Sequence, residues 1–358
     1  MTQRIKAFDV AKSVALAAVI IGHTAIRFQS ASASASKVVA LAFTFHLPLF
    51  FIVSGYFLHT DKPFDCRREA RSLLRPYAIG AGAVVVGSCV SNLVLRDQGS
   101  TLQLFKDWLS AAVYGAGDIA GEGLAVWPQV YRIGGIWFLL ALFWARLFTI
   151  FGFKTKAAPL VSVICFLLGW CSAKYIYLPF DIQCGLCAVP FVTLGAYARR
   201  YSLFDRGAMH PIVWVIFAGI WVWAFVGYEG FSMAMCGYGN TPLAFVRNVS
   251  GAVAGSFCVI GLCCALERGP VGKTGFWCLL ARLGTITLVA LCVHIFEDDV
   301  LRWGLIVDTM SRAPIQGSWA LLAVARCVAD FMVAYVISSA APCFSGALGH
   351  LKAMRAVE

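Results

Sequence analysis

Lys12 and His23 are ionisable residues in a stretch that is otherwise mostly apolar, AKSVALAAVIIGHTAIRF at 11–28. On a helix, a spacing of 11 residues returns to within about 20° of the starting direction and rises about 16 Å, so both side chains share one face. An ionisable group inside a bilayer costs several kcal/mol unless it is paired, hydrated or turned inward. This face therefore offers a cation and, further along, an imidazole that can act as a general base near neutral pH.

Asp9 and Arg27 extend the polar face in both directions. Asp9 lies about 60° from Lys12 around the helix, and Arg27 about 40° beyond His23. We expect Asp9 to pair with Lys12 or with a neighbouring arginine. Two plainer interpretations stay open: Lys12 and Arg27 as anchors that reach the headgroups, and His23 as a structural histidine bonded to another helix.

The composition places the chain among α-helical membrane proteins. It is 60% hydrophobic and 13% charged, with a mean hydropathy of +0.79, whereas soluble domains carry about 25% charged residues. The net charge of +11 then indicates basic cytoplasmic loops and no nucleic-acid partner. Cys184 and Cys187 form a CxxC pair without a second Cys/His pair nearby, so we predict no metal site.

The apolar segments predict an all-α bundle of about ten transmembrane helices in a single integral-membrane domain, 1–358, without a fused soluble domain. With both termini in the cytoplasm, every cytoplasmic segment carries Lys or Arg, as the positive-inside rule requires. The predicted spans are about 11–28, 38–58, 75–95, 134–152, 158–175, 183–198, 211–228, 249–266, 276–295 and 317–340.

Two further histidines, His46 and His294, lie in apolar surroundings. In this topology His23, His46 and His294 all fall in the outer third of the membrane. Ionisable residues at that depth usually face a polar cavity, which we therefore expect here. The segment 96–133 is too short for a separate domain and predicts an interfacial helix or a lid.

Five segments together resemble the membrane acyltransferase-three family, in its sugar O-acetylase, fucose-acetylase-like branch. The first has a basic residue, ten residues and a histidine, and here Lys12 stands where some branches have Arg. The resemblance covers nearly the whole chain in the right order. The segments are FDVAKSVALAAVIIGH, FHLPLFFIVSGYF, GGIWFLLALFWARL, LPFDIQCGLCAVPFVTLGAYARR and LGTITLVALCVH.

The resemblance implies a multi-pass acyltransferase of the inner (cytoplasmic) membrane. It would move an acyl group, commonly acetyl from acetyl-CoA, to a hydroxyl of a cell-surface carbohydrate or its lipid-linked precursor. We expect His23 to act as the general base, with a transient acyl-histidine as the alternative, and Lys12 and Asp9 to complete the catalytic group.

The other expected contacts follow the direction from which each substrate arrives. Acyl-CoA carries several phosphates and is made in the cytoplasm, so cytoplasmic arginines are its expected ligands, although positive-inside topology alone also explains them. These candidates are Arg67, Arg68, Arg71 and Arg75 for acyl-CoA, and His46, Trp137, His294 and Arg27 for the substrates near His23.

Two alternatives remain at this point. A transporter or flippase would use the same intramembrane charges without covalent chemistry, and a succinyl-type enzyme would use another donor. Aromatic residues in the outer loops, including Trp108, Trp127, Tyr228 and Tyr238, could contact a sugar or form an interfacial belt. The sequence indicates neither the acceptor nor the oligomeric state.

Overall fold

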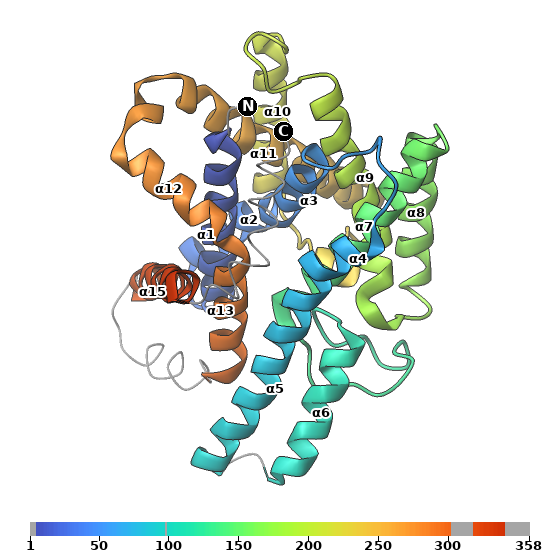
Figure 1. Cartoon of the computed structure of the whole chain (residues 1–358), viewed down its shortest axis with the longest axis vertical. Helices are drawn as coiled ribbons and strands as arrows, with labels where there is room; N and C mark the ends of the chain where they lie inside the picture. Colours follow the sequence, from blue (N-terminus) through green and yellow to red (C-terminus); the bar gives the residue numbers. More distant parts are fainter. Residues whose placement is uncertain (1–4, 97–98, 302–317, 341–358) are drawn as a thin grey trace.

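The computed structural model describes residues 5–96, 99–301 and 318–340, and this part of the chain is helical, with only isolated β-bridges (Figure 1). The predicted all-α class is confirmed for these residues. The helices are α1 (Lys6–Ile26), α2 (Ala33–Phe43), α3 (His46–Tyr56), α4 (Cys66–Glu69), the π-helix η1 (Ala70–Leu74), α5 (Arg75–Leu95), α6 (Thr101–Tyr114), η2 (Gly134–Ile136), α7 (Trp137–Lys154), α8 (Ala158–Ser172), η3 (Pro179–Asp181), α9 (Ile182–Arg200), α10 (Pro211–Val226), η4 (Met233–Met235), α11 (Pro242–Arg268), η5 (Pro270–Lys273), α12 (Gly275–Thr285), α13 (Thr287–Val300) and α15 (Ser318–Ala340).

Seven helical segments of the described residues are long and apolar enough to cross a membrane, and the bent pair α12 and α13 makes an eighth if it is one span. The shorter apolar helices α8 and α10 fall on two more predicted spans. Each predicted span thus overlaps a helix or a helix pair, while the number of crossings stays a prediction. The predicted cytoplasmic termini, 1–4 and 341–358, lie outside the described residues.

Two of the predicted continuous spans are interrupted. The span at 38–58 breaks at Phe45, between α2 and α3. Pro48 explains the break, because proline lacks an N–H and its ring clashes with the carbonyl four residues earlier, here that of Thr44. The span at 276–295 bends by 68° between α12 and α13. The first break places His46 at the start of α3, with its side chain against the preceding turn.

The helix that contains the third predicted span, 75–95, begins earlier than expected. We placed the arginines ahead of residue 75 in a loop, but α4, η1 and α5 form one helical segment over Cys66–Leu95. Asp65 starts it by accepting a hydrogen bond from the backbone N–H of Arg68, at 3.0 Å. The helical spacing turns several of these arginines towards the same cavity instead of leaving them in a flexible loop.

Helix α1 lies within the bundle, in contact with α2, α3, α11, α12 and α15. The carboxylate of Glu267 on α11 accepts the backbone N–H groups of Lys6 and Ala7 at 2.9 and 3.0 Å, which stabilises the start of α1. Gly284 of α12 packs on the backbone of Asp9, where a Cβ atom would come within 1.9 Å of the carbonyl oxygen. These contacts fix the helix that carries Lys12 and His23.

The segment 96–133 contains a helix, as predicted. This helix, α6, packs against α5 at the lower end of the molecule in Figure 1. Trp108 of α6 is buried and stacks on Tyr131 with ring centroids 4.6 Å apart. Tyr238 in the loop after α10 is also fully buried. Trp108 and Tyr238 therefore pack in the core and are not open platforms for a sugar, as one interpretation of the sequence had them.

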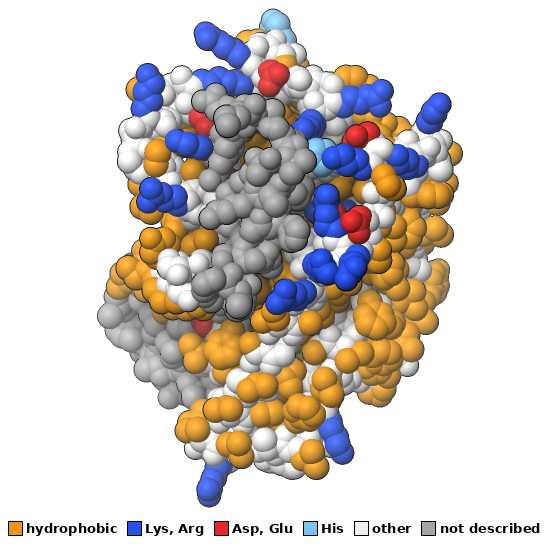
Figure 2. Space-filling model, viewed as in Figure 1, with side chains coloured by type: hydrophobic (Ala, Val, Ile, Leu, Met, Phe, Trp, Pro, Cys, Tyr) orange, Lys and Arg blue, Asp and Glu red, His pale blue; other side chains and the backbone are white. Residues whose placement is uncertain are grey.

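On the face shown in Figure 2, Lys and Arg side chains gather in the upper part of the molecule and hydrophobic side chains dominate below them. The upper part includes the end of α9 with Arg199 and Arg200. This distribution is the one that the positive-inside rule predicts if the upper end faces the cytoplasm.

Candidate active site

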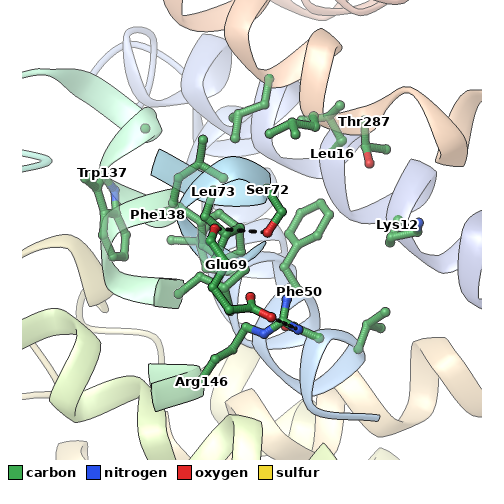
Figure 3. A pocket seen from close by; sticks show the side chains of 18 of the residues that line it. Lys12, Leu16, Phe50, Glu69, Ser72, Leu73, Trp137, Phe138, Arg146 and Thr287 are labelled. Carbon is green, nitrogen blue, oxygen red and sulfur yellow. Dashed lines mark hydrogen bonds and ion pairs between the residues drawn. The ribbon is translucent and has the colours of Figure 1, made fainter. Parts of the chain in front are cut away.

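A cavity of about 780 Å³ lies between α1, α3, the segment from α4 to the start of α5, α7 and α13. Figure 3 shows part of its lining, with Lys12 and Leu16 of α1 across from Trp137 and Phe138 of α7. The wall changes character along the cavity: one part is basic, another is aliphatic and aromatic, and a third contains two histidines.

The basic part contains Lys12 and the four arginines that the sequence predicted for acyl-CoA. Arg71 lies in the π-helix η1, and Arg75 follows at the start of α5. Both side chains line the cavity. Lys12 is held by an ion pair with Asp9 at 2.9 Å, so the predicted pairing is confirmed. The cations on the wall are Lys12, Arg67, Arg68, Arg71 and Arg75, and Arg146 of α7 joins them.

Arg146 and Glu69 form a buried ion pair on the cavity wall, with Arg146 Nη2 3.2 Å from Glu69 Oε1 (Figure 3). Glu69 Oε2 and Arg146 Nε are buried without a hydrogen-bond partner in the described structure. Groups of this kind retain capacity for a bound ligand. We did not predict either residue. Arg146 could have been found, because it is a charged residue within the apolar span 134–152.

The middle of the cavity is apolar. Leu16, Phe50 and Leu142 line it, together with the predicted Trp137 and its neighbour Phe138. Such a wall excludes water and suits an uncharged, narrow ligand.

His23 and His46 lie on the wall at the histidine-containing part of the cavity. His46 Nδ1 is 2.6 Å from the carbonyl oxygen of Ala42. A carbonyl oxygen can only accept, so Nδ1 carries the hydrogen, and in the neutral ring Nε2 is an acceptor. His23 also lies near η2: a Cβ atom added to Gly135 would be 4.0 Å from its ring. The same Cβ would meet Ile295 at 2.9 Å, so Gly135 lets η2 pack closely on Ile295 of α13.

His294 lies behind His23 and is fully buried. Its Nε2 is 3.2 Å from His23 Nδ1, and its Nδ1 is 3.0 Å from Asp330 and 3.2 Å from Glu297. These contacts form a chain from the carboxylates through His294 to His23, which we call the histidine chain. His294 is not on the cavity wall, so a direct substrate contact, as we expected for it, would need a rearrangement.

Arg27 also lies away from the cavity wall. It binds Asp298 at 2.9 Å, and Arg326 of α15 binds the same carboxylate at 2.7 Å. Arg326 further donates from Nε to Glu297 at 2.9 Å and from Nη1 to Thr24 at 3.0 Å. This ionic group fixes α13 and α15 against α1 and gives Arg27 a structural contact, while its expected substrate contact stays a prediction.

One group of side chains has a geometry that could hold a metal ion. His294, Glu297 and Asp330 bring one ligand atom each within 4.8 Å of one another. Arg326, however, donates to the Glu297 oxygen that faces His294, and so already supplies a positive charge there. The histidine chain therefore balances its carboxylates with the protein's own cations, and we assign no metal to it.

Arg326 and Asp330 lie four residues apart in the apolar span 317–340 and were not among the predicted site residues. The rule that intramembrane charges are functional would have selected both. Their partners on α1 and α13 could not be read from the chain, because the three helices are far apart in sequence.

The arrangement is that of a multi-pass helical membrane protein in which a basic pocket leads to buried histidines. A family profile described as an acyltransferase domain matches residues 5–338, and the chain belongs to that family, the membrane acyltransferase family 3. Searches of curated proteins and of solved structures return no match. The predicted membrane acyltransferase class is confirmed, and the transporter alternative loses its support.

Proposed function

We propose that the protein transfers an acyl group, acetyl in the first instance, from acyl-CoA to a hydroxyl of a cell-surface carbohydrate or its lipid-linked precursor. The observation that carries this proposal is the single cavity that joins a group of cations to His23. The family supports acyl transfer, and the resemblance of the sequence to sugar O-acetylases favours the acetyl donor and the carbohydrate acceptor.

The donor would lie along the cavity. Its phosphates would contact Lys12, Arg71 and Arg75, because charge-assisted hydrogen bonds from Lys and Arg are the strongest that a phosphate can accept. Its pantetheine arm would cross the apolar part between Leu16 and Phe138. Lys12 and His23 are about 16 Å apart along α1, so the arm can place the thioester beside His23 while the phosphates stay at the basic end.

The chemistry would begin at His23 Nε2. This atom would take the proton of the acceptor hydroxyl while the oxygen attacks the thioester carbonyl carbon. The carbon–sulfur bond breaks, the ester forms, and the coenzyme leaves as a thiolate that receives the proton from His23. No other reactant is required. A covalent acyl-histidine is the alternative route, and the two differ in whether an acyl-enzyme accumulates without acceptor.

The histidine chain supports the base role. The ionised carboxylates of Asp330 and Glu297 only accept, so His294 Nδ1 carries a hydrogen and its Nε2 is an acceptor when the ring is neutral. While His294 is neutral, His23 Nδ1 donates to its Nε2. That leaves the lone pair of His23 on Nε2, where a general base needs it.

A binding titration tests the donor site. We expect purified wild-type protein to bind acetyl-CoA, and Lys12→Ala to bind it at least 10-fold more weakly, because one charge-assisted phosphate contact contributes about 1.5–3 kcal/mol. Lys37→Ala is the matched control, since Lys37 is exposed on α2 and does not line the cavity. Equal affinity of wild type and Lys12→Ala would exclude Lys12 as a ligand. If folded wild type binds no acyl-CoA, the proposed donor is wrong.

A second prediction concerns the histidine chain. In Asp330→Asn the amide can donate to His294 Nδ1, which would reverse the direction of the hydrogen bonds and move the lone pair of His23 away from Nε2. We expect kcat to fall roughly 10–100-fold, with the KM for acyl-CoA unchanged. The loss of kcat is partial because Glu297 still favours the original tautomer of His294. Asp118→Asn, at an exposed site, is the control. A changed KM with normal kcat would contradict a role in orienting the base.

A further inference from the structure

The CxxC pair of α9 meets a third cysteine from a distant loop. The Sγ atoms of Cys184 and Cys236 are 3.7 Å apart, and both side chains are buried, with 1% and 5% of their surface exposed. Cys187 also lies close enough to interact with Cys236, but its thiol donates to the carbonyl of Phe166 at 3.8 Å. Cys184 is therefore the better placed partner of Cys236.

The loop that carries Cys236 is held in position against α9. Ser232 and Gly237 exchange two backbone hydrogen bonds of 3.0 and 2.8 Å, which close a tight turn. Within it Cys236 adopts a left-handed conformation, with φ of 53°, that is unfavourable for a residue with a side chain. The surroundings must hold such a residue in place, and a covalent bond at its sulfur would do so.

Tyr177 connects the turn to the start of α9. Its hydroxyl lies 3.0 Å from the carbonyl oxygen of Ala234 in the turn, 2.7 Å from Asp181 and 3.0 Å from Cys184 Sγ. Burial raises the pKa of the Tyr177 hydroxyl well above its ordinary value, so it remains a donor. The two sulfurs are thus brought together by contacts on both sides, and their proximity does not depend on one flexible side chain.

The position of this pair relative to the membrane decides its redox state. Helix α9 ends at Arg199 and Arg200, next to the basic end of the molecule. By the positive-inside rule that end faces the cytoplasm, so the opposite end of α9, with Cys184, faces outside. Thiols in contact with each other persist in the cytoplasm but are oxidised in extracytoplasmic compartments.

We propose that Cys184 and Cys236 form a disulfide bond that ties the turn 232–237 to the start of α9. The sulfurs would approach from 3.7 Å to about 2.05 Å, within the range of a small side-chain movement. Each thiol loses one proton and one electron. The two electrons reduce the disulfide of an extracytoplasmic thiol oxidoreductase to a dithiol, through a mixed disulfide, before the turn packs and buries the sulfurs. This inference does not depend on acyl transfer.

Peptide mapping without reductant tests the proposal. Protein purified from native membranes would be denatured in the presence of an alkylating agent, so that buried free thiols react, and then cut with trypsin. Peptide 175–199 contains Cys184 and Cys187, and peptide 207–247 contains Cys236 as its single cysteine. We expect these two peptides to be linked in the wild type, with Cys187 alkylated. Cys187→Ser should keep the link, and Cys184→Ser and Cys236→Ser should each lose it.

A melting experiment covers the case in which a variant folds poorly. Reductant should lower the melting temperature of the wild type and leave that of the Cys184→Ser/Cys236→Ser double variant unchanged. Fully alkylated wild-type peptides would overturn the proposal, as would a link that is lost only in Cys187→Ser. Free thiols together with one zinc per chain, removed by Cys236→Ser, would also overturn it and assign the cysteines and Asp181 to a metal.

Discussion

His23→Ala should insert, fold and bind acyl-CoA but lose acyl transfer by about 10²–10⁴-fold, the range that removal of a general base usually produces. The His23 imidazole lies on the cavity wall. The histidine chain directs its lone pair through the contact of 3.2 Å between His23 and His294. Binding should survive because the cations lie elsewhere along the cavity. The measurement is thioester consumption with an acceptor, alongside acetyl-CoA binding.

Two further variants separate chemistry from structure. His23→Gln can keep a hydrogen bond to His294 but provides no base, so we expect it to fold like the wild type and remain inactive. His210→Ala is the matched control, because His210 is exposed at the start of α10 and does not line the cavity. Wild-type turnover by a folded His23→Ala variant would leave His23 as a structural residue, which the sequence alone left open.

The spacing of residues in one helix carried most of what could be predicted about the site. Lys12 and His23 share a helix face because of their spacing alone, whatever packs around the helix. The structure places both on the same cavity wall. The arginines from Arg67 to Arg75 could be chosen because phosphates need cations on the cytoplasmic side. Local periodicity and charge are enough for such predictions.

The residues behind His23 show why the rest could not be predicted. Asp330 reaches His294 from α15, and His294 reaches His23 from α13, so the histidine chain needs three helices packed together. The break in the span at 38–58 was missed for another reason: its cause, Pro48, is local, but hydropathy averaged over a window treats 38–58 as one span. His46 owes its hydrogen bond with Ala42 to that break.

The crossing of α3 and α9 should be the part of the fold most sensitive to one added methyl group. A Cβ atom at Gly55 would lie 1.9 Å from the carbonyl oxygen of Val192, and one at Gly195 would lie 2.0 Å from that of Ile52. Glycines at both contacts let the two backbones approach closely, as small residues do between membrane helices. Because each obstacle is backbone, neither helix can yield by rotating a side chain.

Gly195→Ala and Gly55→Ala should therefore each destabilise the protein by about 3 kcal/mol or more, at the upper end of the overpacking range. Melting temperature and the yield of monodisperse protein measure this. Gly219→Ala in α10 is the matched control, since an added Cβ meets no atom within 4 Å there and alanine favours helix. If Gly195→Ala melted like the wild type, α3 and α9 could not lie as close as described. Because α3 also carries His46 and Phe50 on the cavity wall, separation of α3 from α9 should reduce turnover even in the fraction that folds.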